Sequence, residues 1–318
     1  MVPFILYSMT CLVEKLSYFS NIRVPVNVTF LLFASALLIS GCSPAPESIT
    51  HSQDNANAKL NNTSTKFNDV TITFSVHFQG LPIQCDQSLN IQNEQWQISE
   101  LAMFFSQFSL NNVRPIILDD NDWQSQQIAL IRYAPGCKKT TGNMSVVAAI
   151  ENIDSKTPLT LSFNVGVPFA VNHQNPLIQA SPLNDSSMFW AWRNGYKFIR
   201  WDMQNDMGDS WSFHLGSVGC ESAAMVRAPK RPCAQSNLIP VEIVLSSDSI
   251  QVLDVPQKKD VVQSGVKMKQ IHINISIHLD EIIRNMVPTR KSSCMFSGID
   301  NTTCNELVEN LKLNAVFN

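Results

Sequence analysis

Two histidines and four of the six tryptophans in this chain lie between Phe163 and Cys220, and their side chains are the ones best suited to holding a metal ion. Imidazole is a good copper ligand, and copper has the highest affinity of the common divalent metals for nitrogen sites. The histidines are His173 and His214, and the tryptophans are Trp190, Trp192, Trp201 and Trp211. Because each indole buries a large apolar area, the cluster is also typical of a hydrophobic core. Composition alone favours the core.

Other residues of this segment allow two further interpretations. The histidines with Asp185 or Asp202 could activate a metal-bound water, which would make the chain a metal-dependent hydrolase, but no HExxH or nucleophile motif accompanies them. Exposed tryptophans could instead contact a protein or a sugar in a ligand-free interaction module. Met188 and Met203 are soft donors that suit Cu(I), although core packing accounts for both.

The remaining histidines stand apart from this cluster. His272 and His278 lie on the polar face of the alternating run Gln270–Leu279. Because they stand six residues apart on a strand, about 20 Å separates them, and they cannot bind one ion together. His77 lies on another expected strand and matches no motif, and His51 lies in a polar segment. We interpret all four as solvated or packed residues.

Short runs in which apolar and polar residues alternate cover most of the chain after residue 69, separated by clusters of Pro, Gly, Asn and Asp. The pattern predicts many short strands, as in a sandwich or barrel. We expect an all-β fold, an antiparallel β-sandwich stapled by disulfides, with a short C-terminal helix at Thr303–Leu311. The expected strands are Asp69–Phe78, Trp96–Leu110, Gln127–Tyr133, Leu159–Val165, Lys197–Met203, Ser210–Leu215, Ile239–Leu245 and Gln270–Leu279.

The apolar run Val24–Ile39 and the small residues before Cys42 predict a lipoprotein signal peptide, in which the cysteine is lipidated after cleavage. An ordinary signal peptide or an uncleaved anchor is the alternative, and Met9 is an alternative start. The next segment is rich in Ser, Asn and Thr, which predicts a disordered tether. The expected organisation is a signal peptide at 1–41, a lipidated Cys42 with its tether at 42–68, and a folded domain at 69–318. We therefore expect a lipid-anchored protein of the cell envelope that faces the periplasm or the cell exterior.

Six of the eight cysteines lie beyond the leader, namely Cys85, Cys137, Cys220, Cys233, Cys294 and Cys304. An even number in an exported chain without a CxxC pair favours disulfides over thiolate metal sites. Closeness in sequence favours Cys220 with Cys233 and Cys294 with Cys304, which would leave Cys85 for Cys137; other connectivities stay open. The formal net charge of -3 and the lack of a long Lys/Arg run argue against nucleic acid or anionic lipid headgroups as partners.

Several short motifs follow one another in a set order within residues 70–245. They are Phe163-Asn164-Val165-Gly166-Val167-Pro168-Phe169, Val171-Asn172-His173, Ser181-Pro182-Leu183-Asn184, Met188-Phe189-Trp190-Ala191-Trp192, Gly195-Tyr196-Lys197-Phe198 and His214-Leu215-Gly216-Ser217-Val218-Gly219-Cys220. In this order and spacing the chain resembles the MbnP family, also called metallo-mystery pair four-Cys motif proteins. Cys85, Cys137, Cys220 and Cys233 match the four cysteines of that family. The region after about residue 255 lies beyond the clearest match.

The resemblance implies an extracytoplasmic copper-binding protein, not an enzyme, with a role in copper handling. Its expected partner is a dihaem, MauG-like c-type cytochrome peroxidase that oxidises a tryptophan to kynurenine. Kynurenine has an aromatic amine that can bind copper, whereas intact indole offers only an N–H donor. On the matching motifs the ligands are His173 and His214. The oxidised residue is Trp190 or Trp192, and the sequence does not choose between them.

Overall fold

The computed structural model describes most of the chain after residue 66, and all described residues belong to one unit, Asn62–Asn318. They are residues 67–84, 86–112, 114–125, 127–134, 142–151, 158–254, 269–295 and 302–318. The expected signal peptide, Cys42 and the tether up to residue 66 lie outside them, as do Cys85 and Cys137. Within these stretches no helix is long and apolar enough to cross a membrane.

One sheet contains the two strands with the clearest alternation in the sequence. Its order is β16 (Ile250–Asp254), β17 (Lys269–His278), β1 (Phe67–Phe78), β9 (Ser145–Glu151) and β6 (Ile117–Leu118), and β2 (Leu81–Pro82) pairs with β1. β1 begins two residues earlier than expected, because Phe67 already pairs with Glu151. β1 and β17 run parallel to each other, unlike the antiparallel pairs that we expected throughout. Their register places His77 opposite His278.

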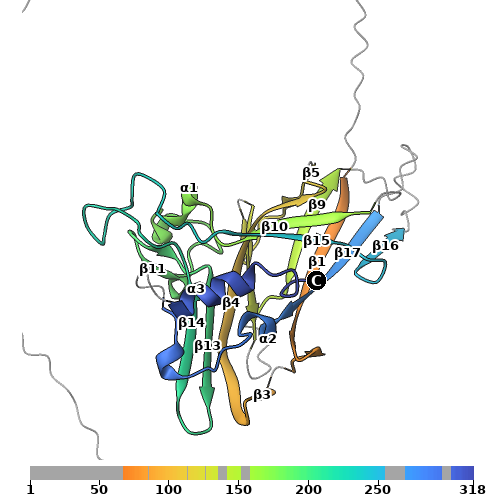
Figure 1. The fold of residues 1–318 in the computed structure, drawn as a ribbon. Coiled ribbons are helices and arrows are strands. Elements are labelled where there is room, and N and C mark those ends of the chain that lie inside the picture. Colours follow the sequence, from red (N-terminus) through yellow and green to blue (C-terminus); the bar gives the residue numbers. More distant parts are fainter. Residues whose placement is uncertain are drawn as a thin grey trace, which may run out of the picture. The chain divides into compact units, whose positions relative to one another are not determined.

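The second sheet is organised by one long strand, β4 (Glu94–Leu110). The main order is β14 (Ser210–Leu215), β13 (Ile199–Asn205), β4, β10 (Thr160–Val165) and β15 (Ile239–Val244). β8 (Ile128–Tyr133), β3 (Leu89–Ile91) and β5 (Arg114–Pro115) also pair with β4, and β7 (Gln124–Ser125) pairs with β8. Figure 1 shows β4, β13 and β14 running side by side. All eight expected strands are therefore present, with boundaries within a few residues of those predicted.

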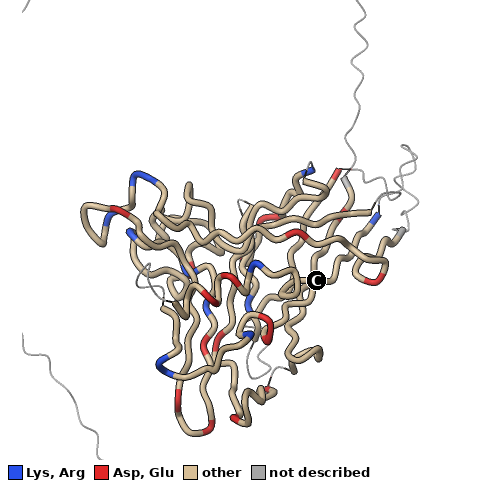
Figure 2. The backbone as a smooth tube through the Cα atoms, viewed as in Figure 1, with Lys and Arg blue, Asp and Glu red and all other residues tan. Residues whose placement is uncertain are grey.

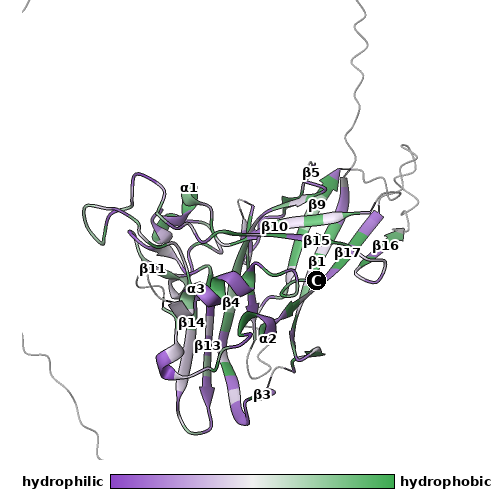
Figure 3. Ribbon diagram, viewed as in Figure 1, coloured by the Kyte–Doolittle hydropathy of each residue, from purple (hydrophilic) through white to green (hydrophobic). Residues whose placement is uncertain are grey.

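The two sheets pack face to face through aromatic side chains. Phe74 of β1 stacks on Phe105 of β4 with 4.8 Å between ring centroids, and Phe163 of β10 meets both rings edge-on. In Figure 3 hydrophobic and hydrophilic residues mix along the strands, as expected where one face of each sheet is buried and the other faces water. Full burial of each phenylalanine contributes about 1.5–3 kcal/mol, so these rings help to hold the two layers together.

The C-terminal segment covers the edge of the second sheet, where β14 would otherwise expose its backbone. The Cys294 amide donates to the Ser212 carbonyl, and the His214 amide donates to the Cys294 carbonyl, both at 2.8 Å. A disulfide joins Cys294 to Cys304 in α3 (Thr302–Leu311), the expected C-terminal helix. The short helices α2 (Leu279–Ile282) and η6 (Arg290–Ser292) lie between β17 and α3 in the chain. This cover fixes β14, the strand that carries His214.

The three remaining short helices and the smallest sheet lie between β10 and β13 in the chain. They are α1 (Phe169–Asn172), η3 (Pro176–Ile178), η4 (Ser186–Met188), β11 (Phe189–Ala191) and β12 (Gly195–Tyr196). β11 and β12 pair with each other as a two-stranded hairpin, with Phe189 opposite Tyr196. The alternation predicted none of these elements, because each is too short to show a period.

Candidate functional site

Trp190 and Trp192 lie on and just after β11, and both are partly exposed. Trp201 and Trp211 are fully buried and pack edge-on with 5.0 Å between their centroids. The cluster therefore divides into a core pair and a surface pair. The core interpretation is correct for Trp201 and Trp211, and it is also correct for Met188 and Met203, which are buried. Of these four tryptophans, Trp190 and Trp192 are the two that a reagent from outside can reach.

His214 has one ring nitrogen bound to a carboxylate and the other without a partner. Its Nε2 lies 2.7 Å from Oδ1 of Asp202, on the neighbouring strand β13. Its Nδ1 is buried and makes no hydrogen bond. The His214 residue is 6 % exposed, so water does not supply the missing bond freely. A buried nitrogen with a lone pair and no donor nearby is the arrangement expected of a metal ligand.

Asp202 determines which nitrogen of His214 carries the proton. Burial acts to raise the pKa of Asp202, but hydrogen bonds from His214 and Ser212, the His214 charge and Arg200 together lower it to about 2. The carboxylate is therefore ionised at neutral pH and accepts hydrogen bonds only. Nε2 is therefore a protonated nitrogen, and in the neutral imidazole the lone pair lies on Nδ1. The group that the sequence suggested as a hydrolytic carboxylate instead orients a histidine.

Trp190 covers the same histidine. The centroids of the Trp190 and His214 rings lie 6.5 Å apart. The indole lies against the backbone of Gly216, where an added Cβ would come within 2.6 Å of Trp190 Cζ3 and 2.9 Å of the Tyr196 carbonyl oxygen. The glycine in the His-Leu-Gly motif is thus needed for the close approach of the indole to β14. The sequence alone gave no sign of this packing role.

His173 ends α1, and its ring is held on both sides. Nδ1 lies 3.1 Å from the Trp192 carbonyl oxygen, so this nitrogen carries the proton. Nε2 accepts a hydrogen bond from the Asn172 amide at 3.2 Å and lies 3.5 Å from Sγ of Cys233. Burial lowers the pKa of His173, and the Trp192 carbonyl partly offsets that effect by raising it. The imidazole is neutral, which is the form that binds metals.

The side chain of Asn172 fixes the local backbone around His173. Its oxygen accepts from the Tyr196 amide at 2.8 Å, and its amide donates to Ser217 at 3.2 Å. Gly195, at a φ of +76°, lies so close that a Cβ there would meet Asn172 Oδ1 at 2.5 Å. The Asn-His and Gly-Tyr motifs are therefore two halves of one contact. Asn172 belongs to the Asn-His motif, but the motif did not predict that its side chain holds the Tyr196 backbone.

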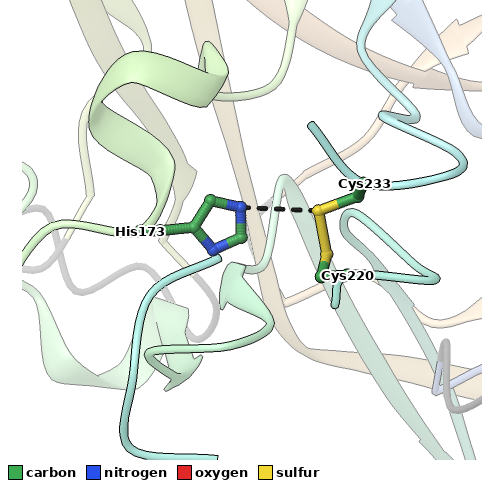
Figure 4. Close-up of side chains that lie close together, drawn as sticks. All are labelled: His173, Cys220 and Cys233. Atoms are coloured by element: carbon green, nitrogen blue, oxygen red, sulfur yellow. Dashed lines mark hydrogen bonds between the residues drawn. A yellow bond between two sulfur atoms is a disulfide. The ribbon is translucent and has the colours of Figure 1, made fainter. Parts of the chain in front are cut away.

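A disulfide lies directly beside His173. Figure 4 shows the ring facing the Cys220–Cys233 bond, and the ligand atoms of the three residues lie within 4.8 Å of one another. Bonded sulfurs are poor metal ligands compared with thiolates, so this trio is a scaffold while the disulfide is intact. Both described disulfides, Cys220–Cys233 and Cys294–Cys304, confirm the pairs that closeness in sequence favoured. The expected pair Cys85–Cys137 lies outside the described residues.

The two histidines thus reach the β11–β12 hairpin from different elements. His214 of β14 packs by the Trp190 ring, and His173 of α1 bonds to the Trp192 backbone. Each ring has separate hydrogen-bond partners: Asp202 for His214, and Asn172 and the Trp192 carbonyl for His173. The hairpin is the shared element of the candidate site.

The fold and this site define a disulfide-stapled β-sandwich in which two buried histidines flank a hairpin with two tryptophans. The family model for MbnP matches residues 67–296, so the chain belongs to the MbnP family, which is associated with copper. A solved structure, MbnP from Methylosinus trichosporium, has a similar fold, with a TM-score of 0.59 and 19% identity, covering 76% of this chain and 87% of that one. No curated protein matches this chain.

Proposed function

We propose that this chain binds a copper ion outside the cytoplasm, with Nδ1 of His214 as its principal ligand. The observation that carries the proposal is the buried, unpartnered Nδ1 on a ring whose Nε2 is committed to an ionised Asp202. A carboxylate behind the imidazole makes it a more basic ligand and fixes its orientation. Membership of a copper-associated family supports copper over other metals that imidazole also suits.

His173 is the second proposed ligand, through Nε2. Its Nδ1–H is held by a backbone carbonyl, which leaves the lone pair on Nε2, as in ligating histidines generally. Copper there would replace the hydrogen bond from Asn172. The second N–H of that amide would keep its bond to Ser217, so binding leaves one amide N–H without its present partner, and this cost reduces the affinity that His173 contributes.

Trp190 is the proposed source of the kynurenine ligand. Its indole packs beside the His214 ring and is partly exposed, so an external oxidant can reach a tryptophan that neighbours the proposed ligand. Cleavage of the indole C2–C3 bond by two molecules of peroxide would insert two oxygen atoms and release two waters. Hydrolysis of the resulting formyl group would release formate and leave an aromatic amine. The MauG-like dihaem peroxidase is the proposed partner that draws these electrons.

The contacts of the Asp185 and Asp202 carboxylates fit a metal-binding role better than a hydrolytic one. Asp185 pairs with Arg132 at 2.8 Å and accepts from the Ser187 amide, and Asp202 is occupied by His214, Ser212 and Arg200. Neither is placed to serve a metal-bound water. The disulfides support an oxidising compartment, in line with the proposed lipid anchor at Cys42. Lys/Arg and Asp/Glu are interspersed along the described chain (Figure 2), which supports a partner other than nucleic acid.

Copper titration of protein purified from cells that also express the partner peroxidase tests the proposal. We expect His214→Gln to weaken copper binding by about 100-fold and His173→Gln by about tenfold or more. His272→Gln, a change on the outer face of β17, is the matched control and should leave it unaltered. Peptide mass spectrometry should find Trp190 converted, with Trp201 and Trp211 intact. Unchanged copper affinity in His214→Gln would refute the site, and six unmodified tryptophans would refute the kynurenine ligand.

A further inference from the structure

Two histidines from opposite ends of the folded domain meet on the outer face of the first sheet. The parallel register of β1 and β17 sets His77 opposite His278, and their ring centroids lie 5.2 Å apart with the planes tilted by 45°. Metal–imidazole bonds are about 2.0–2.1 Å long, which puts the centres of two rings on one tetrahedral ion about 5 Å apart. The pair already has the spacing of a two-nitrogen chelate.

Each ring is fixed by one hydrogen bond to an oxygen acceptor. His278 donates from Nε2 to Oδ1 of Asn318, 3.1 Å away, and the His77 ring donates to the Gly80 carbonyl. Nε2 of His77 lies 3.0 Å from the Ser75 hydroxyl, which can donate to it or rotate away. One nitrogen of each ring therefore keeps a lone pair that metal can use.

The carboxylate of Asp280, near the histidine pair, has a buried oxygen without a hydrogen-bond partner. Asp280, in α2, follows His278 by two residues, and its Oδ1 is buried without a hydrogen bond. Its charge acts on His77. A buried carboxylate oxygen is costly unless a cation or donor compensates it. A cation held by the two rings would supply that compensation.

We propose that His77 and His278 form a second metal site, binding one divalent transition-metal ion such as Zn²⁺ as a chelating pair, with Asp280 as the neutralising charge. Water completes the coordination of the ion, since both rings are partly exposed. The site depends on no part of the copper site, because it is built from β1, β17 and α2 and uses neither His173 nor His214.

Calorimetric titration of zinc into the protein carrying His214→Gln tests the pair without a contribution from the proposed copper site. We expect one zinc site, weakened by about tenfold or more when His77→Gln or His278→Gln is added. His272→Gln is the matched control, because His272 lies on the same face of β17 but opposite Thr71. The control should keep the zinc affinity. Equal affinity in all variants, or an equal loss in the control, would overturn the proposal.

Diffraction at the zinc absorption edge on zinc-soaked crystals of the unmutated protein gives a second readout that does not depend on the folding of any variant. We expect an anomalous peak between the His77 and His278 rings. The absence of a peak between these two rings refutes the pair, whether or not zinc also occupies the His214 site. Because zinc is placed directly, this result stands whether or not copper binds at His214.

Discussion

Replacing Asp202 by asparagine tests whether the carboxylate behind His214 serves the metal or only the fold. Asparagine keeps the size and one acceptor oxygen but removes the charge. The pKa of Asp202 falls from 3.8 to about 2 in the folded protein, and each pKa unit corresponds to about 1.4 kcal/mol, so the charge contributes about 2 kcal/mol of stability. Its side chain is 18% exposed, so solvent screens the interaction only in part.

The direction of the pH dependence follows from a folded-state pKa that is depressed. The Asp202 contribution is complete above the unfolded-state pKa of about 4 and disappears as the pH falls towards 2. Chemical denaturation should therefore show Asp202→Asn less stable by about 2 kcal/mol at pH 7, with the gap closing across that window. Asp206→Asn, in the exposed β13–β14 turn, is the matched control and should show no such gap.

Copper affinity separates the two roles of Asp202. A carboxylate that orients a ligating histidine typically contributes about 10- to 100-fold to metal affinity, so Asp202→Asn should lose that much in a competition titration with a chelator. A variant that lost stability but kept its copper affinity would show that Asp202 only stabilises the β13–β14 pair. That outcome would refute the assignment of His214 Nδ1 as ligand, because nothing else holds that tautomer.

Three further changes test neighbouring parts of the structure. Gly216→Ala should displace Trp190, whose ring leaves no room for a Cβ, and cost about 1–3 kcal/mol in denaturation experiments, with weaker copper binding; a normal variant would refute the packing of the indole on β14. The double variant Cys294→Ser/Cys304→Ser should lose about 2–3 kcal/mol because it frees a short loop, and faster hydrogen exchange along β14 should accompany the loss. Asp280→Asn should weaken zinc binding at the His77–His278 pair severalfold in calorimetry, while leaving copper binding unchanged.

The sandwich was predictable because burial on one face of a sheet requires a period of two in the sequence. β17 shows this with isoleucines at alternate positions, and its bounds were predicted to within a residue. β9 was missed because the small residue Ala148 weakens the same alternation, although Val146 and Ile150 are buried beside it. The parallel pairing of β1 with β17 could not be predicted, since it joins residues about 200 positions apart and no local pattern encodes the choice of partner.

The site was predictable as a set of residues but not as a set of contacts. The motifs select His173, His214 and the β11 tryptophans, yet they say nothing of which nitrogen is free. That depends on Asp202, which faces His214 only through the register of β13 with β14. The roles of Asn172 and Gly216 were missed for the same reason. Asn172 matters because it holds the Tyr196 backbone, and Gly216 matters because it leaves room for the Trp190 ring.

The histidines of the two proposed metal sites differ in the hydrogen bonds that each must give up to bind an ion. His214 needs no rearrangement, because its free nitrogen already lacks a partner. His173 must give up the hydrogen bond from the Asn172 amide, and it lies against a disulfide sulfur. The loss of that hydrogen bond reduces the copper affinity that His173 contributes. His77 must release only a hydroxyl at a partly exposed position. Copper affinity should therefore fall more when His214 is replaced than when His173 is replaced. A larger loss for the His173 variant would mean that His173, beside the disulfide, is the principal ligand rather than His214 on β14.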